Sequence, residues 1–91
     1  MLHIIKTQSS IHSALNYVQT GDVILLMEEA VYLANSHHHL HALLAEKAVY
    51  VLIPDINARG LQSVIADNLL QVDYPGFVEL SERHSSSLTW E

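Results

Sequence analysis

Apolar and polar residues alternate in short blocks along the chain, and the apolar blocks predict strands. Leu2 to Ile5 is a short β-rich opening run, Val23 to Met27 is five uninterrupted apolar residues, and Ala48 to Ile53 is a third such run. Unbroken apolar runs are typical of strands covered on both faces, as in a parallel sheet. A fourth, shorter strand is predicted around Leu70 to Tyr74.

Helical patterns separate these runs. After Ser9 and Ser10, which can cap a helix, apolar residues recur at the helical spacing i, i+3, i+4 and i+7: Ile11, Ala14, Leu15 and Val18. Gly21 is expected near the end of this helix. Residues 28–35 are predicted to be helical, and a further helix is expected to continue, after a break, through the histidine-rich stretch to Lys47.

The second half of the chain follows the same alternation. Pro54 stops the third strand, and Asp55 is placed to cap a short helix that ends before Gly60. A helical segment is predicted over Gln62 to Asn68, and Pro75 can open a last helix with Phe77, Val78 and Leu80 on one side. No element is predicted in the tail SSSLTWE, which is polar except for Leu88 and Trp90.

Strands separated by helices imply parallel crossover connections with helices on both faces of the sheet. The predicted fold is a single α/β domain over residues 1–91, with three α/β/α layers around a small, mostly parallel sheet of about four to five strands.

Charge and composition narrow the functional classes. Four Lys and Arg against ten Asp and Glu give a net charge of -6, the wrong sign for direct binding to nucleic-acid phosphates. A hydrophobic content of 49% with 15% charged residues is high for a short chain, so part of the apolar surplus is expected to face a partner. With no signal-like leader and no apolar run near the ~20 residues of a membrane span, a cytoplasmic protein is expected.

The usual catalytic motifs are missing. Cysteine is absent, which excludes disulfides, thiolate metal sites and thiol catalysis within this chain. The segment KTQSS after the first strand has no glycine to form a phosphate loop, and Ser63 and Asp67 lack a GxSxG context for a catalytic triad. Glu28 and Glu29 follow a strand at its carboxyl end, where open sheets bind ligands, but first-turn helix acids explain them better.

Four of the seven histidines lie within five positions in NSHHHLHALLAEK. If residues 37–46 are helical, His37 and His41 are four apart and His38 and His41 three apart, so two imidazoles could chelate a metal ion from one face. Two ligands make no specific site, and we predict neither a metal centre nor another cofactor; His37, His38 and His41 remain weak candidates. Weak pH sensitivity of a nearby interface is a further expectation.

Four segments together resemble the TusB/DsrH family of sulfur-relay proteins: MLHIIKTQS, GDVILLMEEAVYLA, VYVLIPDINARGL and VDYPGFVELSERHSSSLTW. They occur in the family's order and cover most of the chain. The resemblance implies a DsrE-like fold and a heterohexamer with TusC-like and TusD-like subunits, two copies of each. It further implies that the complex takes persulfide sulfur from TusA and passes it to TusE for 2-thiolation of the tRNA wobble uridine, or that a DsrEFH-type complex serves dissimilatory sulfur oxidation.

The chain departs from part of that family at Ala14, the position that aligns with a cysteine in certain DsrH proteins. Alanine cannot form a persulfide, because only a thiolate supplies the nucleophile and the S–S bond. We therefore expect a non-catalytic subunit rather than an enzyme, with the sulfur-carrying cysteine in a partner.

The candidate interface residues are Glu28, Glu29, Tyr32, His37, His41 and Trp90. Trp90 either packs over the core of its own domain or anchors an interface, and Arg59 is expected to brace its turn or pair with an acid rather than bind substrate. Two other functions stay open: a stand-alone metal-binding domain that uses the histidines with Glu28 or Glu29, and a homo-oligomer that binds a small acidic ligand at the strand ends.

Overall fold

The computed structural model describes all residues, 1–91, and contains one five-stranded sheet in which every strand pair is parallel. The strands are β1 (Leu2–Ile5), β2 (Val23–Leu26), β3 (Ala48–Leu52), β4 (Leu70–Val72) and β5 (Ser87–Trp90). Their order across the sheet is β4-β3-β2-β1-β5. The predicted α/β fold with a small parallel sheet is confirmed.

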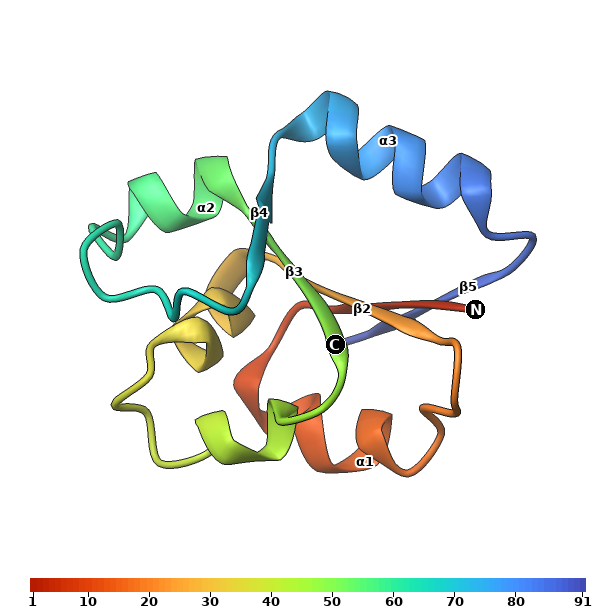
Figure 1. The fold of residues 1–91 in the computed structure, drawn as a ribbon, viewed down its shortest axis with the longest axis horizontal. Coiled ribbons are helices and arrows are strands. Elements are labelled where there is room, and N and C mark those ends of the chain that lie inside the picture. The colour runs from red at the N-terminus through yellow and green to blue at the C-terminus, as the bar shows by residue number, and fades with distance from the viewer.

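Three α-helices and three 3-10 helices connect the strands. The α-helices are α1 (Ile11–Leu15), α2 (Ile53–Ala58) and α3 (Tyr74–Arg83), and the 3-10 helices are η1 (Gln8–Ser10), η2 (Glu28–Ala34) and η3 (His41–Leu44). Figure 1 shows α1 and α3 on opposite sides of the strands, which gives three layers. No helix is both long and apolar enough to cross a membrane.

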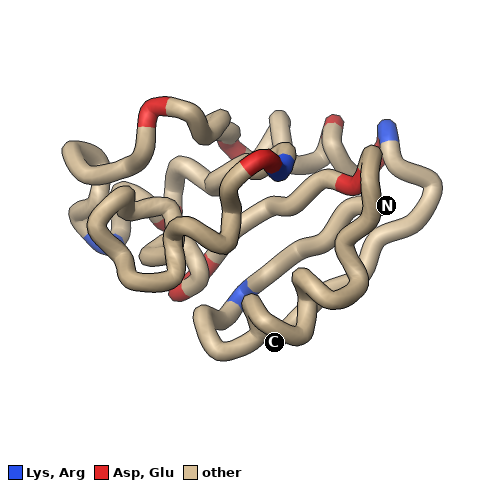
Figure 2. The backbone as a smooth tube through the Cα atoms, turned by 60° about the horizontal axis from the view of Figure 1, so that its bottom comes forward, with Lys and Arg blue, Asp and Glu red and all other residues tan.

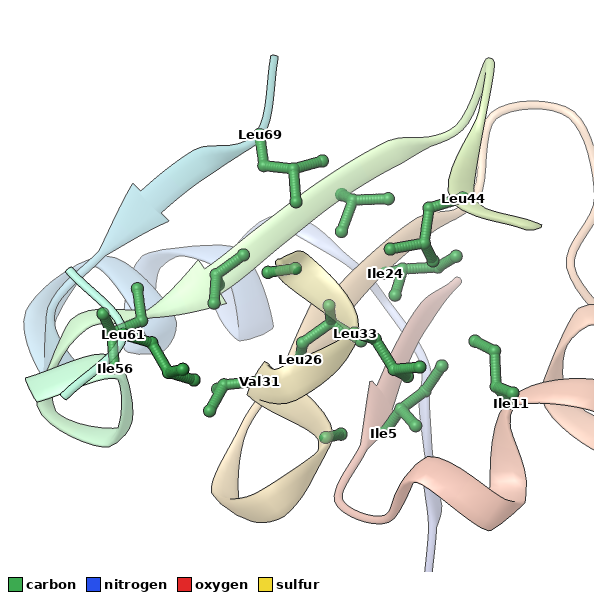
Figure 3. Close-up of a cluster of buried hydrophobic side chains, with 14 of the residues drawn as sticks. Ile5, Ile11, Ile24, Leu26, Val31, Leu33, Leu44, Ile56, Leu61 and Leu69 are labelled. Carbon is green, nitrogen blue, oxygen red and sulfur yellow. The ribbon is translucent and has the colours of Figure 1, made fainter. Parts of the chain in front are cut away.

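The two faces of the sheet bury cores of different size, because successive strand side chains point to opposite faces. On one face, Ile5, Ile24 and Leu26 join residues from α1, α2, η2 and η3 in a cluster of 15 buried residues (Figure 3). On the other face, Leu2, Ile4 and Leu25 meet Leu80 of α3 in a cluster of 4. One helix therefore covers one face, while most connecting segments pack on the other.

The start of α3 follows the sequence prediction closely. Asp73 caps the helix by accepting a hydrogen bond from the Gly76 N–H at 2.9 Å, and Pro75 lies in the first turn, where its missing N–H costs nothing. A Cβ atom at Gly76 would lie 3.0 Å from Cβ of Val72. Glycine therefore allows the helix to pass close to β4.

The helix predicted over Gln62 to Asn68 is wrong. The structure has turns there and an antiparallel bridge between Asn35 and Ile65, and the Ala66 N–H donates to the Ala34 carbonyl at 3.0 Å. Val64 and Ile65 pack against the larger core. Backbone bonding to a distant segment has replaced the local helical bonds.

The helix predicted through the histidine stretch is also wrong: the chain forms turns and only the short η3. Side-chain acceptors compete with helical bonding, because Asn35 Oδ1 accepts from the His37 N–H at 2.9 Å and His38 Nδ1 accepts from the Leu40 N–H at 3.0 Å. Residues 28–35 are helical as predicted, though as a 3-10 helix, and the first helix is shorter than its apolar pattern indicates.

The polar tail, for which no element was predicted, forms β5 at the edge of the sheet. It pairs with β1 in parallel, placing Leu88 beside His3 and Trp90 beside Ile5. At β3, Ile53 begins α2 instead of ending the strand, and Pro54 lies in the first turn of that helix. Asp55 does not cap α2, because its carboxylate accepts a hydrogen bond from the Glu28 N–H.

Candidate functional site

Charged side chains gather where the parallel strands end, the edge at which open α/β sheets bind ligands. Lys6 follows β1, and its Nζ lies 3.4 Å from Glu28 Oε2 and 3.4 Å from Glu91 Oε1. The hydrogen bond to Glu28, followed by that to Glu91, raises the pKa of Lys6 above its ordinary value. The ammonium group is thus already paired with two carboxylates of the chain itself.

Glu28, the first residue after β2 and Met27, has an uncommon backbone conformation with φ +51°. Its N–H donates to Asp55 Oδ2 at 2.6 Å, and Asp55 Oδ1 lies 3.7 Å from Arg59 Nη1. The prediction that Arg59 braces its turn or pairs with an acid is therefore confirmed. The backbone turn held by Asp55 leaves the Glu28 side chain 53% exposed beside Lys6.

Glu29 makes a different set of bonds from Glu28. Both the backbone N–H and the side-chain amide of Gln8 donate to the Glu29 carboxylate, the latter at 3.0 Å to Oε2. Gln8 Oε1 in turn pairs with His38 Nε2 at 2.7 Å. The two adjacent glutamates therefore do not form a jointly acting pair, and Glu29 anchors the loop after β1 to the histidine segment.

The two ring nitrogens of His38 are both used. Because Nδ1 accepts from the Leu40 N–H, the proton of the neutral ring is on Nε2, where it donates to Gln8. Burial, with smaller effects from His39 and His41, lowers the pKa of His38 below its ordinary value. His38 is consequently a neutral brace with no free nitrogen for a metal ion.

His37 and His41 line an open groove of about 540 Å³ together with residues 63–68. His41 donates from Nδ1 to the Leu33 carbonyl at 2.8 Å, which leaves its Nε2 without a hydrogen bond within the chain, and the His39 ring stacks on His38 with 4.6 Å between centroids. Nowhere are three or more His, Asp or Glu side chains arranged to hold a metal ion. The helix geometry predicted for the histidines is therefore not formed, although His37 and His41 border the same groove.

A second polar cluster, at the amino end of the sheet, was missed by the sequence analysis. His3 is fully buried in β1; its Nε2 lies 3.0 Å from Asp22 Oδ2, and its Nδ1 accepts from the Trp90 indole N–H at 3.2 Å. The other Asp22 oxygen accepts from the N-terminal ammonium group at 3.0 Å. A histidine inside a strand predicted to be buried was the available signal, since buried polar groups need hydrogen-bond partners.

Hydrogen bonds also stabilise the charged form of Asp22. The Gln19 N–H makes the largest contribution, and His3 and the N-terminal ammonium add to it, so the pKa of Asp22 is held well below its ordinary value. Trp90 packs partly against the larger core and lies 5.4 Å from Tyr17, centroid to centroid. Of the two roles expected for Trp90, the structure thus shows the contact with its own core.

The six candidate interface residues come from two segments of the chain. Glu28, Glu29, Tyr32, His37 and His41 all lie on the segment that follows β2, whereas Trp90 lies on β5. The sheet order places β1 between β2 and β5. Acidic residues are likewise spread over several elements, among few basic ones (Figure 2).

Comparison with known proteins gives a consistent family assignment. Residues 6–87 match the family model described as DsrH like protein. Protein TusB of Pectobacterium parmentieri is 34% identical, over 99% of this chain and 100% of that protein. Protein TusB of Cronobacter sakazakii is 38% identical, over 91% and 90%, and Protein TusB of Escherichia coli O9:H4 (strain HS) is 36% identical, over 84% and 82%.

Proposed function

This chain belongs to the TusB/DsrH family, and from that premise we propose that it is a non-catalytic subunit of a TusBCD-type sulfurtransferase complex. In this proposal the complex relays persulfide sulfur, from TusA to TusE, for 2-thiolation of the tRNA wobble uridine. The chain works in the cytoplasm with TusC-like and TusD-like subunits, two copies of each, and does not touch nucleic acid itself.

The observation that carries the non-catalytic role is the absence of any cysteine among the 91 residues. A persulfide forms on a thiolate and is passed on by attack of another thiolate, so this chain has no atom that can hold the sulfur. Ala14, aligned with the cysteine of some relatives, is fully buried in α1 and offers only a methyl group. The sulfur is therefore carried by a partner subunit.

Exposed apolar side chains support a role in assembly. Large hydrophobic side chains are exposed on several elements: Tyr17, Tyr32, Leu70, Tyr74, Val78 and Leu88. Both edge strands, β4 and β5, also leave one side of their backbone without a strand partner. Assembly with other subunits covers part of such a surface.

We place the partner contact on the segment after β2. Tyr32 is 37% exposed on η2, close in the chain to the exposed Glu28 and to the groove bordered by His37 and His41. Glu29 is hydrogen-bonded to Gln8, which is in turn hydrogen-bonded to His38, and these bonds hold the segment after β2 in place. A central aromatic side chain with polar residues around it is the usual make-up of an interface hot spot.

The test is the native mass of the untagged chain co-expressed with the two similar-sized α/β proteins encoded beside it. We expect a stable assembly with two copies of each subunit and a persulfide on a cysteine of a partner only. If the chain stays alone at every concentration, or passes sulfur to TusE without its partners, the proposed function is wrong.

Paired variants locate the interface. Tyr32→Glu should weaken assembly by at least about thirtyfold, since burying an unpaired charge at a hot spot costs about 2 kcal/mol or more. Val78→Glu, which changes an apolar side chain that is 50% exposed on α3, should assemble like the unchanged protein. The reverse pattern would keep the subunit role and move the interface to α3.

The family match also fits the alternative function, a DsrEFH-type subunit in dissimilatory sulfur oxidation. The two functions differ in the molecule that receives the sulfur. Deletion of the gene should abolish 2-thiouridine at the tRNA wobble position if the TusBCD-type function is correct. Unchanged tRNA thiolation, together with loss of sulfur oxidation, would favour the alternative.

A further inference from the structure

The buried His3 has one defined protonation state in this structure. Trp90 can only donate from its indole nitrogen, so Nδ1 of His3 must be the acceptor of their hydrogen bond. Nε2 therefore carries the proton and donates it to Asp22 Oδ2. His3 is neutral and connects the start of β2 to the end of β5 across β1.

A second proton on His3 would break its hydrogen bond to Trp90 but not its hydrogen bond to Asp22. An imidazolium has N–H groups at both nitrogens, so Nδ1 would face the Trp90 indole with a donor against a donor. The bond to Asp22 would be kept and strengthened, because a charged donor would then meet a carboxylate. Protonation of His3 and the hydrogen bond of Trp90 therefore exclude each other.

Trp90 is also the main side-chain anchor of β5. Ser87, Leu88 and Thr89 are exposed, whereas Trp90 is half-buried and packs against the larger core. The remaining contact of this four-residue strand is its backbone ladder with β1, flanked by the bonds from Leu2 to Ser86 and from Lys6 to Trp90. A short edge strand with one anchor depends strongly on that anchor.

We propose that the hydrogen-bond chain Asp22–His3–Trp90 is a proton-sensitive latch: it holds β5 on the sheet while His3 is neutral, and protonation of His3 releases Trp90. Loosening of β5 exposes the outer edge of β1 to solvent. This inference does not depend on the sulfur-relay function, because it concerns only groups of this chain.

Charged and titratable groups face the latch from several segments packed against it. Asp22 stays ionised because its pKa is held low. The N-terminal ammonium group donates a hydrogen bond to Oδ1 of that carboxylate, the oxygen that does not contact His3. From the turn after α1, the titratable side chain that reaches the latch is Tyr17, through its ring contact with Trp90. At the end of β5, Lys6 and Glu91 are paired with each other.

The latch can be followed directly, because Trp90 is the only tryptophan. In the full-length ¹⁵N-labelled chain, the ring nitrogens of His3 and the Trp90 indole N–H are recorded by NMR from about pH 8 to about pH 5, the range in which histidines change charge. We expect Nδ1 of His3 to gain its proton and the indole signal to shift with the same midpoint. After correction for intrinsic rates, amide exchange in β5 should accelerate about fivefold relative to β3, as expected for the loss of one hydrogen bond.

Two variants complete the test. His3→Gln, whose amide can donate and accept but takes up no proton, should abolish the pH response of Trp90, whereas His12→Gln on the exposed side of α1 should keep it. If His3→Gln does not fold, the titration of the unchanged protein decides alone. The latch is ruled out if His3 stays neutral to about pH 5, if His3 gains a proton while Trp90 does not respond, or if a folded His3→Gln variant retains the response.

Discussion

Two histidine-bearing regions of this protein differ in how the fold uses them. Residues 37–41 hold four histidines in turns near the surface, of which only His38 has both ring nitrogens bonded within the chain. His3 stands alone in β1, is fully buried, and is bonded at both nitrogens to residues from other strand ends. The number of histidines in a segment is thus a poor guide to where an imidazole is structurally important.

The physical reason is the cost of leaving a buried polar group without a partner. At the surface, water can replace a lost hydrogen bond, so each histidine of the 37–41 segment has a small individual effect. His3 is fully buried, so removal of its ring leaves the Trp90 indole N–H without its acceptor and Asp22 without one of its three donors. The comparison can be tested by removing one group at a time from each region.

The largest effect is expected from His3→Ala. It removes a buried ring and two hydrogen bonds, and we expect a loss of about 3 kcal/mol in the free energy of unfolding. His39→Ala, in the exposed segment, should change it by less than about 0.5 kcal/mol. Urea unfolding of both variants near neutral pH measures the difference, and equal values would remove the distinction between the regions.

Asp22→Asn should have the next largest effect, about 2 kcal/mol, because the charged acceptor for three donors is lost. The folded pKa of Asp22 lies below its ordinary value of 3.8. Its stabilisation is therefore fully present above about pH 4 and is lost as the pH falls toward the folded value. Unfolding measured between about pH 7 and about pH 2 should show a shallower acid loss in the variant, and parallel curves would contradict this assignment.

The smallest effect is expected from Gln8→Ala, which acts on the histidine segment alone. Gln8→Ala removes the link between Glu29 and His38, and we expect a loss of about 1 kcal/mol because this network is only partly buried. Hydrogen exchange of residues 35–44 should accelerate, while β5 should exchange as before. Ser9→Ala, at a neighbouring exposed position, serves as the control. Faster exchange in β5 would show that the two regions are coupled.

Local patterns predicted the elements whose bonding is local or whose burial is complete. The run from Val23 to Met27 predicted β2 because every side chain in it favours burial, and Pro75 marked the first turn of α3 because its effect on the backbone is local. Gln62 to Asn68 looked helical but bonds instead to the end of η2. No pattern within seven residues can report a partner 30 positions away.

In the candidate site, too, some features could be predicted from the sequence and others could not. The carboxyl-end position of Glu28 and Glu29 followed from strand prediction alone, and a structural role for Arg59 followed from its place in a short turn that contains an acid. The positive φ of Glu28 and its hydrogen bond to Asp55 could not be predicted, because Asp55 lies 27 positions away in the chain. Strand β5 was missed because its polar residues are typical of a tail, and only pairing with β1 makes it a strand.

By itself, the sequence determined that this chain has an α/β fold with a parallel sheet, that it resembles the TusB/DsrH family, and that it has no thiol to carry sulfur, since these properties depend on residue types and their local order. Only the tertiary structure decided which histidine is embedded in a hydrogen-bond network across the sheet. His3 and Trp90 are 87 positions apart. Their contact exists because the chain returns to the edge of β1, and a hydrogen bond of that kind depends on the closure of the whole fold.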